Sequence, residues 1–177
     1  GMNGALEIRR FEEELKSYHA AEHVFLVSSG KASLYLILKA LHRLHPERDS
    51  VVIPAFNCYS VPSAIVRAGL RVRLCDIDPV TLDFAGPALE ALVKSDQAGT
   101  ILAIMPTHLF GVPSDVPRIR RLVAGTPIKV VEDAAQALGG KAQGCRLGTQ
   151  GDVGFFSLGR GKVFSTVEGG VVLTSDA

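Results

Sequence analysis

The chain has 177 residues, 47% of them hydrophobic, and its 19 basic and 18 acidic side chains leave a formal net charge of +1. This length suffices for a domain with a sizeable core, and the composition excludes an intrinsically disordered chain. The near-neutral charge, without a basic stretch, argues against a nucleic-acid-binding protein. We expect one domain over residues 1–177.

The three cysteines, Cys58, Cys75 and Cys145, are widely spaced and form no C-x-x-C pair. An odd number at such spacing favours free thiols in a reducing compartment over disulfides or a zinc site. The sequence contains neither an apolar run long enough to span a membrane nor a signal peptide. These features predict a cytoplasmic protein that has no membrane partner and no metal.

Apolar residues at helical spacing alternate along the chain with short apolar runs that are typical of buried strands. In chain order we expect a helix at residues 4–19, a strand at 24–27, a helix at 32–42, a strand at 51–53, a helix at 61–68, a strand at 70–75, a helix at 87–94, a strand at 101–105, a helix at 116–123, and strands at 128–131, 153–156 and 170–174.

This alternation predicts an α/β fold with three layers, in which a mostly parallel sheet of seven strands carries helices on both faces. The connection between the last two strands is short for a helical crossover. It also contains four glycines, Gly159, Gly161, Gly169 and Gly170. We therefore expect the last strand to run antiparallel.

Five of the predicted strands end in polar or glycine-containing turns, which contain Ser29-Gly30, Asn57, Thr107-His108, Asp133 and Ser157. In open parallel sheets, ligands bind at the carboxyl ends of the strands. The sequence therefore predicts a ligand site at which these turns meet.

The segment Ser29-Gly30-Lys31 lies between a predicted strand and a predicted helix. Backbone N–H groups at a helix N-terminus beside a glycine bind phosphate, although an ordinary glycine turn is the alternative. The segment is not a Walker A loop, and the chain lacks the G-x-G-x-x-G pattern of dinucleotide-binding proteins.

An acid, a hydroxyl and an amine are expected at the same edge. Asp133 follows a strand of Ile and Val, so its carboxylate is expected to be buried. A protonated pyridine nitrogen would pair with such a carboxylate. The alternative is that Asp133 caps a helix at residues 134–138. Lys162, beside Gly161, suits a Schiff base with an aldehyde, or else it is a solvated surface lysine. Ser157 suits a phosphate, or else it caps its own turn. The set predicts a site for pyridoxal 5′-phosphate (PLP).

Six segments that follow one another between residues 24 and 176 carry a family signature. They read S-S-G-K-A-S-L, V-V-I-P-A-F-N-C-Y-S, C-D-I-D-P-V-T-L-D-F, I-M-P-T-H-L-F-G-V-P-S-D, V-V-E-D-A-A-Q-A-L-G-G, and G-D-V-G-F-F-S-L-G-R-G-K with the later E-G-G-V-V-L-T. Together they resemble the DegT/DnrJ/EryC1/StrS family of PLP-dependent sugar aminotransferases. The resemblance implies the large domain of fold type I, without the smaller C-terminal domain of that family.

The resemblance also implies roles for matching residues. Lys162 would bond to the cofactor and carry protons, Asp133 would pair with the pyridine nitrogen, and Gln136 would contact the 3-hydroxyl oxygen of the ring. From the residues alone, Gln136 could equally face water.

The phosphate would be held by Gly30, Lys31 and Ser157. Lys31 stands where the family has threonine, so it would act through its backbone or its charge.

Cys58 departs from the family, which usually has an aromatic ring over the cofactor at this position. We expect Phe56, Tyr59 or His108 to compensate, while a structural role is the alternative for His108.

By resemblance, the chain is the cofactor-binding half of an enzyme that transfers an amino group from an amino acid, expected to be glutamate, to a nucleotide-linked keto sugar for polysaccharide biosynthesis. The family implies a homodimer. One alternative is an inactive PLP-fold module for interaction or regulation, which Cys58 and the chain length favour. Another is a sugar dehydratase, in which histidine replaces the lysine, and Lys162 argues against it.

Overall fold

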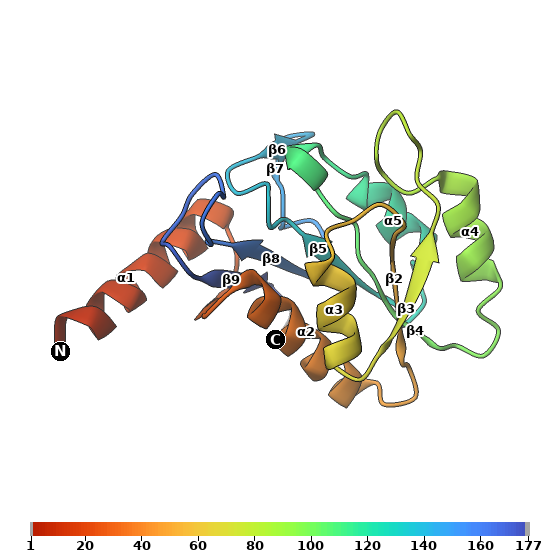
Figure 1. Ribbon diagram of the computed structural model, residues 1–177, viewed down its shortest axis with the longest axis horizontal. Coiled ribbons are helices and arrows are strands. Elements are labelled where there is room, and N and C mark those ends of the chain that lie inside the picture. Colours follow the sequence, from red (N-terminus) through yellow and green to blue (C-terminus); the bar gives the residue numbers. More distant parts are fainter. Residues whose placement is uncertain (1, 176–177) are drawn as a thin grey trace.

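The computed structural model describes residues 2–175, so Gly1, Asp176 and Ala177 lie outside the described residues. A seven-stranded sheet with the order β1-β9-β8-β5-β4-β2-β3 forms the centre of the molecule (Figure 1). Its strands are β1 (His23–Val27), β2 (Ser50–Pro54), β3 (Arg71–Cys75), β4 (Ile101–Ile104), β5 (Lys129–Asp133), β8 (Val153–Ser157) and β9 (Gly170–Thr174). A separate two-stranded ribbon consists of β6 (Lys141–Ala142) and β7 (Cys145–Arg146).

Helices cover both faces of the sheet, as the sequence predicts. They are α1 (Met2–His19), α2 (Gly30–Leu44), α3 (Ser60–Arg67), α4 (Gly86–Lys94) and α5 (Val116–Leu122), with a short 3₁₀ turn, η1 (Leu109–Gly111). One face packs against α2 and α3, and the other packs against α4, α5 and the end of α1. The predicted three-layer α/β architecture is therefore confirmed.

Strand direction also follows the prediction. The strands β3, β2, β4, β5 and β8 are mutually parallel, whereas β9 pairs antiparallel with both of its neighbours, β8 and β1. Because β9 reverses direction between them, β1 and β8 point the same way. The carboxyl end of β1 therefore lies at the same edge of the sheet as those of the parallel strands.

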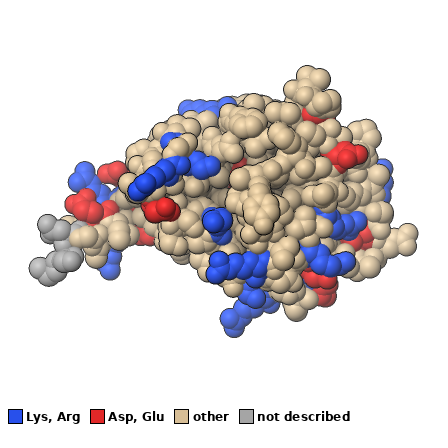
Figure 2. Space-filling model, viewed as in Figure 1, with Lys and Arg blue, Asp and Glu red and all other residues tan. Residues whose placement is uncertain are grey.

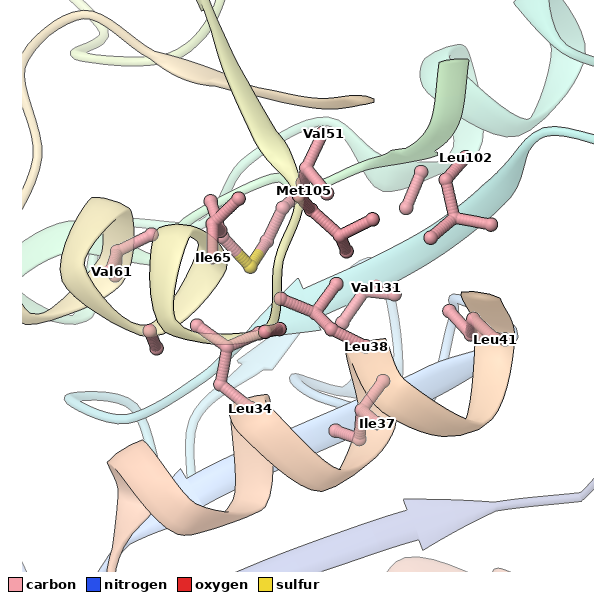
Figure 3. Close-up of a cluster of buried hydrophobic side chains, with 14 of the residues drawn as sticks. Leu34, Ile37, Leu38, Leu41, Val51, Val61, Ile65, Leu102, Met105 and Val131 are labelled. Atoms are coloured by element: carbon pink, nitrogen blue, oxygen red, sulfur yellow. The ribbon is translucent and has the colours of Figure 1, made fainter. Parts of the chain in front are cut away.

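The larger core cluster forms where α2 and α3 meet the sheet (Figure 3). Leu34 and Leu38 of α2 and Ile65 of α3 are at most 1% exposed and pack with Val51 of β2. The next residue of the strand, Val52, joins the cluster on the opposite face. Burying such a side chain contributes about 1.5–3 kcal/mol, so the alternation fixes which strand residues face which helices.

The end of β5 differs from the prediction. The strand extends through Asp133, which pairs with Phe155 of β8. Residues 134–140 form turns and contain no helix, so the alternative in which Asp133 caps a helix is wrong. The segment forms two successive turns instead, in which the N–H of Ala137 donates to the carbonyl of Ala134 and the N–H of Gly140 donates to the carbonyl of Ala137.

Acidic and basic side chains lie interspersed on the face that Figure 2 shows, and some basic ones gather toward its lower edge. This mixture agrees with the small net charge of the chain. Among residues 2–175, no helix combines the length and the apolar character needed to cross a bilayer.

Candidate functional site

The five polar strand ends meet at one cavity of about 230 Å³. Its lining includes Ser29, Gly30, Asn57, Thr107, His108, Asp133 and Ser157, together with Lys31, Cys58, Gln136 and Lys162. The structure thus brings together the seven residues to which the sequence analysis gave a role toward the cofactor, namely Gly30, Lys31, Cys58, Asp133, Gln136, Ser157 and Lys162. The convergence follows from the parallel strand order, which puts these turns on one edge.

One wall of the cavity is the N-terminus of α2. Ser29 is the N-cap, and its Oγ accepts a hydrogen bond from the N–H of Ala32 at 3.1 Å. The first N–H groups of a helix have no acceptor within the helix and favour anions. Gly30 lies against Ser157, and a Cβ on residue 30 would be 2.8 Å from Ser157 Cβ. The absence of a side chain at Gly30 therefore brings the helix terminus and a hydroxyl together.

The carboxylate of Asp133 forms the opposite, buried part of the site. The residue is 5% exposed, and its Oδ1 accepts a hydrogen bond from the N–H of Ala135 at 3.0 Å. Burial raises the pKa of Asp133 to about 6, against the opposing effects of the Ala135 N–H and the charge of Lys162. Its Oδ2 accepts no hydrogen bond from the described residues, which leaves an acceptor for a ligand.

Lys162 reaches the cavity from the loop between β8 and β9. The preceding residue, Gly161, has a φ of +81°, and the N–H of Lys162 donates to the carbonyl of Gly159 at 3.2 Å. The side chain of Lys162 is half-buried. Its charge acts on both Asp133 and Cys58. An amine and a carboxylate from distant segments therefore share the cavity.

Gln136 is held in a defined orientation. Its Oε1 accepts a hydrogen bond from the N–H of Phe110 at 3.0 Å. Phe110 lies in η1 with a φ of +55°. Because the amide oxygen is occupied, the Nε2 group of Gln136 is left as the donor for a ligand oxygen.

Three residues were expected to compensate for the missing aromatic ring at position 58, and they differ in their relation to the cavity. Phe56 and Tyr59 are 52% and 83% exposed and do not line the cavity. His108 lines the cavity but is fully buried and engaged through both nitrogens. Of the three residues, His108 alone lines the cavity among the residues that the structure describes.

His108 has a structural partner that the sequence analysis missed. Its Nδ1 accepts the N–H of Ser114 at 3.1 Å, so the ring proton lies on Nε2, which donates to Glu132 Oε2 at 2.8 Å. Glu132 is fully buried and also accepts N–H groups from Gly148, Gln150 and Gly151. Strand alternation, which turns Glu132 away from Asp133, was the signal that could have revealed this role.

The donor set fits a ligand that combines a phosphate, a basic ring nitrogen and an aldehyde. The helix N-terminus and Ser157 suit the phosphate, the free oxygen of Asp133 suits a ring N–H, and the amine of Lys162 suits the aldehyde. PLP is a cofactor that carries these three groups.

Comparison with known proteins gives the same assignment. Residues 2–177 match the DegT/DnrJ/EryC1/StrS aminotransferase family. An L-glutamine:2-deoxy-scyllo-inosose aminotransferase from Streptomyces kanamyceticus is 34% identical over 168 residues, which are 95% of this chain and 38% of that protein. The GDP-perosamine synthase of Caulobacter vibrioides is 31% identical over 169 residues, which are 96% of this chain and 44% of that protein.

A solved structure shares the fold. The Escherichia coli GDP-4-keto-6-deoxy-D-mannose-3-dehydratase with bound hydrated PLP aligns with a TM-score of 0.86 at 27% identity, over 96% of this chain and 43% of that one. The chain thus spans less than half the length of these proteins. It nevertheless belongs, over its described length, to the DegT/DnrJ/EryC1/StrS family of PLP-dependent aminotransferases.

Proposed function

We propose that this chain is the PLP-binding domain of an enzyme that transfers an amino group from an amino acid, glutamate, to a nucleotide-linked keto sugar. One observation carries the proposal: Asp133 and Lys162, from segments far apart in the sequence, line one cavity and interact electrostatically. A carboxylate for the ring nitrogen and an amine for the aldehyde are the two groups that PLP chemistry needs from a protein.

The other site residues have the following proposed roles. Ser157 and the backbone N–H groups of Gly30 and Lys31 hold the phosphate, and the Nε2 group of Gln136 donates to the ring oxygen. Cys58 contacts the cofactor where relatives have an aromatic ring. These assignments fit the lining of the cavity and the orientation of Gln136.

When bound, PLP supplies an aldehyde that takes up the amino group and a ring that withdraws electrons. Asp133, as an anion, keeps a proton on the ring nitrogen. Lys162 is the group that accepts a proton from the substrate carbon and returns it during the transfer. The buried position of Asp133 limits the contact of its carboxylate with solvent.

The substrate class is proposed from the relatives. The GDP-perosamine synthase and the GDP-4-keto-6-deoxy-D-mannose dehydratase are named for nucleotide-linked sugars. Lys162 supports amino transfer over dehydration, because a dehydratase of this family has histidine in place of the lysine. The complete set of Asp133, Lys162 and Ser157 argues against the alternative of an inactive interaction or regulatory module.

We also propose a cytoplasmic homodimer. Exposed apolar side chains, among them those of Phe56, Tyr59, Phe110 and Val163, lie within two residues of positions that line the cavity. A second subunit that packs against some of these side chains would remove them from water. Three free cysteines agree with a reducing compartment.

The test is a titration of the protein with PLP, followed by visible absorbance. Wild-type protein is expected to develop a band that is distinct from that of free PLP, and glutamate is expected to change it as 2-oxoglutarate forms. Lys162→Ala should lose the band, whereas Lys39→Ala, an exposed change outside the cavity lining, should keep it. A wild-type protein without such a band would refute the proposal.

A further inference from the structure

Cys58 is a thiol that opens into the proposed cofactor cavity. We propose that Cys58 is a site of reversible covalent modification, through which low-molecular-weight disulfides close this cavity to the cofactor. The inference rests on the proposed function, because it assigns a form of regulation to the same site.

The cavity offers a ligand a hydrogen-bond acceptor that does not involve the cysteine. Asp133 is 5% exposed and lines it, and the Oδ2 of this carboxylate has no hydrogen-bond donor among residues 2–175. The carboxylate thus keeps one oxygen open to the cavity, where it can accept a hydrogen bond from a ligand. A group attached to Cys58 would compete for the same space.

The surroundings of Cys58 favour the reactive form of the thiol. Its Sγ accepts a hydrogen bond from Ser60 Oγ at 3.1 Å. This bond and, to a smaller extent, the positive charge of Lys162 hold the pKa of Cys58 below its ordinary value. The thiolate is the nucleophile in disulfide exchange, and the residue is exposed, so both conditions for reaction are met.

The other two cysteines serve as internal comparisons. Cys75 is buried, and burial raises its pKa to about 11. Cys145 is exposed on β7 and does not line the cavity. Exposure alone would therefore make Cys58 and Cys145 equivalent, whereas the site environment distinguishes Cys58.

The reaction is a thiol–disulfide exchange. The Cys58 thiolate attacks one sulfur of a small disulfide, a new S–S bond forms, and the original S–S bond breaks. The departing sulfur leaves with the electron pair and takes up a proton, so Cys58 is oxidised as one sulfur of the reagent is reduced. A small thiol reverses the step. The attached group then lies in the space beside Asp133 and Lys162.

The experiment treats the chain with glutathione disulfide, quenches it at intervals and measures each cysteine by peptide mass spectrometry. Cys58 should react about tenfold faster than Cys145, and prior PLP should slow only Cys58. Ser60→Ala should slow Cys58 by about three- to tenfold, since it removes the hydrogen bond to sulfur. The modified protein should lose the PLP absorbance band and regain it with dithiothreitol.

The Cys58→Ser variant has no thiol at this position, so its PLP affinity should be the same before and after treatment. A loss of affinity in this variant would instead indicate that the treatment damages the fold. Equal rates at Cys58 and Cys145, or an unchanged Kd for PLP in the modified protein, would overturn the inference. If untreated protein shows no PLP band, the proposed function and the closure of a cofactor site both fail. The mass measurement then still decides separately whether Cys58 is the preferred thiol.

Discussion

Gly30, the first residue of α2, packs so tightly against Ser157 at the end of β8 that a Cβ on residue 30 would lie 2.8 Å from that of Ser157. Real Cβ atoms do not approach other atoms so closely, and the obstructing atoms belong to the Cβ and backbone of Ser157, which cannot swing aside. The helix terminus and the serine hydroxyl can lie this close together only while residue 30 lacks a side chain, and we propose that together they bind the phosphate.

Gly30→Ala should therefore displace α2 from β8 and widen the cradle. We expect a loss of about 1–3 kcal/mol in the free energy of unfolding, from the clash in a packed region. We also expect at least about a tenfold weaker affinity for PLP, because misplaced N–H donors no longer converge on the phosphate. Gly4→Ala is the control, since nothing lies within 4 Å of its Cβ position. Equal urea midpoints for the two variants would contradict the cradle.

Asp133 should make the stability of the cofactor-free protein depend on pH. Burial raises its pKa from 3.8 to about 6, so between these values the folded state binds more protons than the unfolded state. The free energy of unfolding is therefore highest while Asp133 is protonated at low pH, and it falls as the carboxyl loses its proton on the way up through pH 6. Asp133→Asn should thus be more stable than wild type by about 2–3 kcal/mol near neutral pH, a difference that fades toward pH 4.

Urea unfolding of cofactor-free wild type and Asp133→Asn across this range measures the effect. A difference that stays constant from acid to neutral pH would show that the carboxylate is not strained by burial. With PLP present the order should reverse at neutral pH, because the amide cannot replace an anion beside the ring nitrogen.

Glu132→Gln should destabilise the fold strongly although the two side chains have the same shape. The carboxylate accepts four N–H groups, from His108, Gly148, Gln150 and Gly151, and an amide group would face some of these donors with its own N–H. We expect a loss of about 3 kcal/mol in thermal or urea unfolding. Glu90→Gln, an exposed change on α4, should lie within about 0.5 kcal/mol of wild type.

Val167→Gly should stabilise the protein. Val167 has a φ of +76°, which is strained for a β-branched residue. Glycine relieves this strain but costs more backbone entropy on folding. The net gain in the free energy of unfolding is expected to be about 1 kcal/mol, which would raise Tm by about 2–4 °C. Val163→Gly, in the same loop and 77% exposed but without a positive φ, should not raise Tm. Calorimetry of both variants separates strain relief from general loop effects.

Cys58→Tyr should tighten PLP binding. The substitution supplies an aromatic ring at position 58, which lines the cavity and carries only a thiol in this chain. A stacked ring contributes about 0.5–1.5 kcal/mol, which corresponds to a Kd about three- to tenfold lower. Cys145→Tyr, outside the cavity lining, should leave Kd unchanged. Weaker binding by Cys58→Tyr would mean that residue 58 does not face the ring plane.

The sequence was sufficient to predict the layers, the strand directions and the convergence at the site, because these depend on local signals. Apolar runs stopped by Gly, Pro or Asp mark the strands, and parallel order then brings their ends together. The short glycine-rich connection likewise indicated the reversal at β9. Asp133 and Lys162 could be placed on one edge by this reasoning alone.

Contacts between distant turns could not be predicted in this way. The donors to Glu132 lie in residues 148–151, and the bond that orients Gln136 comes from the left-handed backbone of Phe110. The exposure of Phe56 and Tyr59 depends on how the turn after β2 leaves the sheet. Residues 134–138 have good helix propensity, yet the chain forms two successive turns there, with bonds from Ala137 to Ala134 and from Gly140 to Ala137.

The antiparallel strand β9 sits between β8 and β1, so β1, at the sheet edge, pairs with the strand formed last among the seven. During synthesis on the ribosome, residues 23–27 emerge early and must wait for residues 170–174 before they are hydrogen-bonded into the sheet. Pairing across such a separation is slow, and an unpaired apolar strand is open to aggregation meanwhile. Closure of this edge of the sheet therefore depends on contacts between the two ends of the described chain.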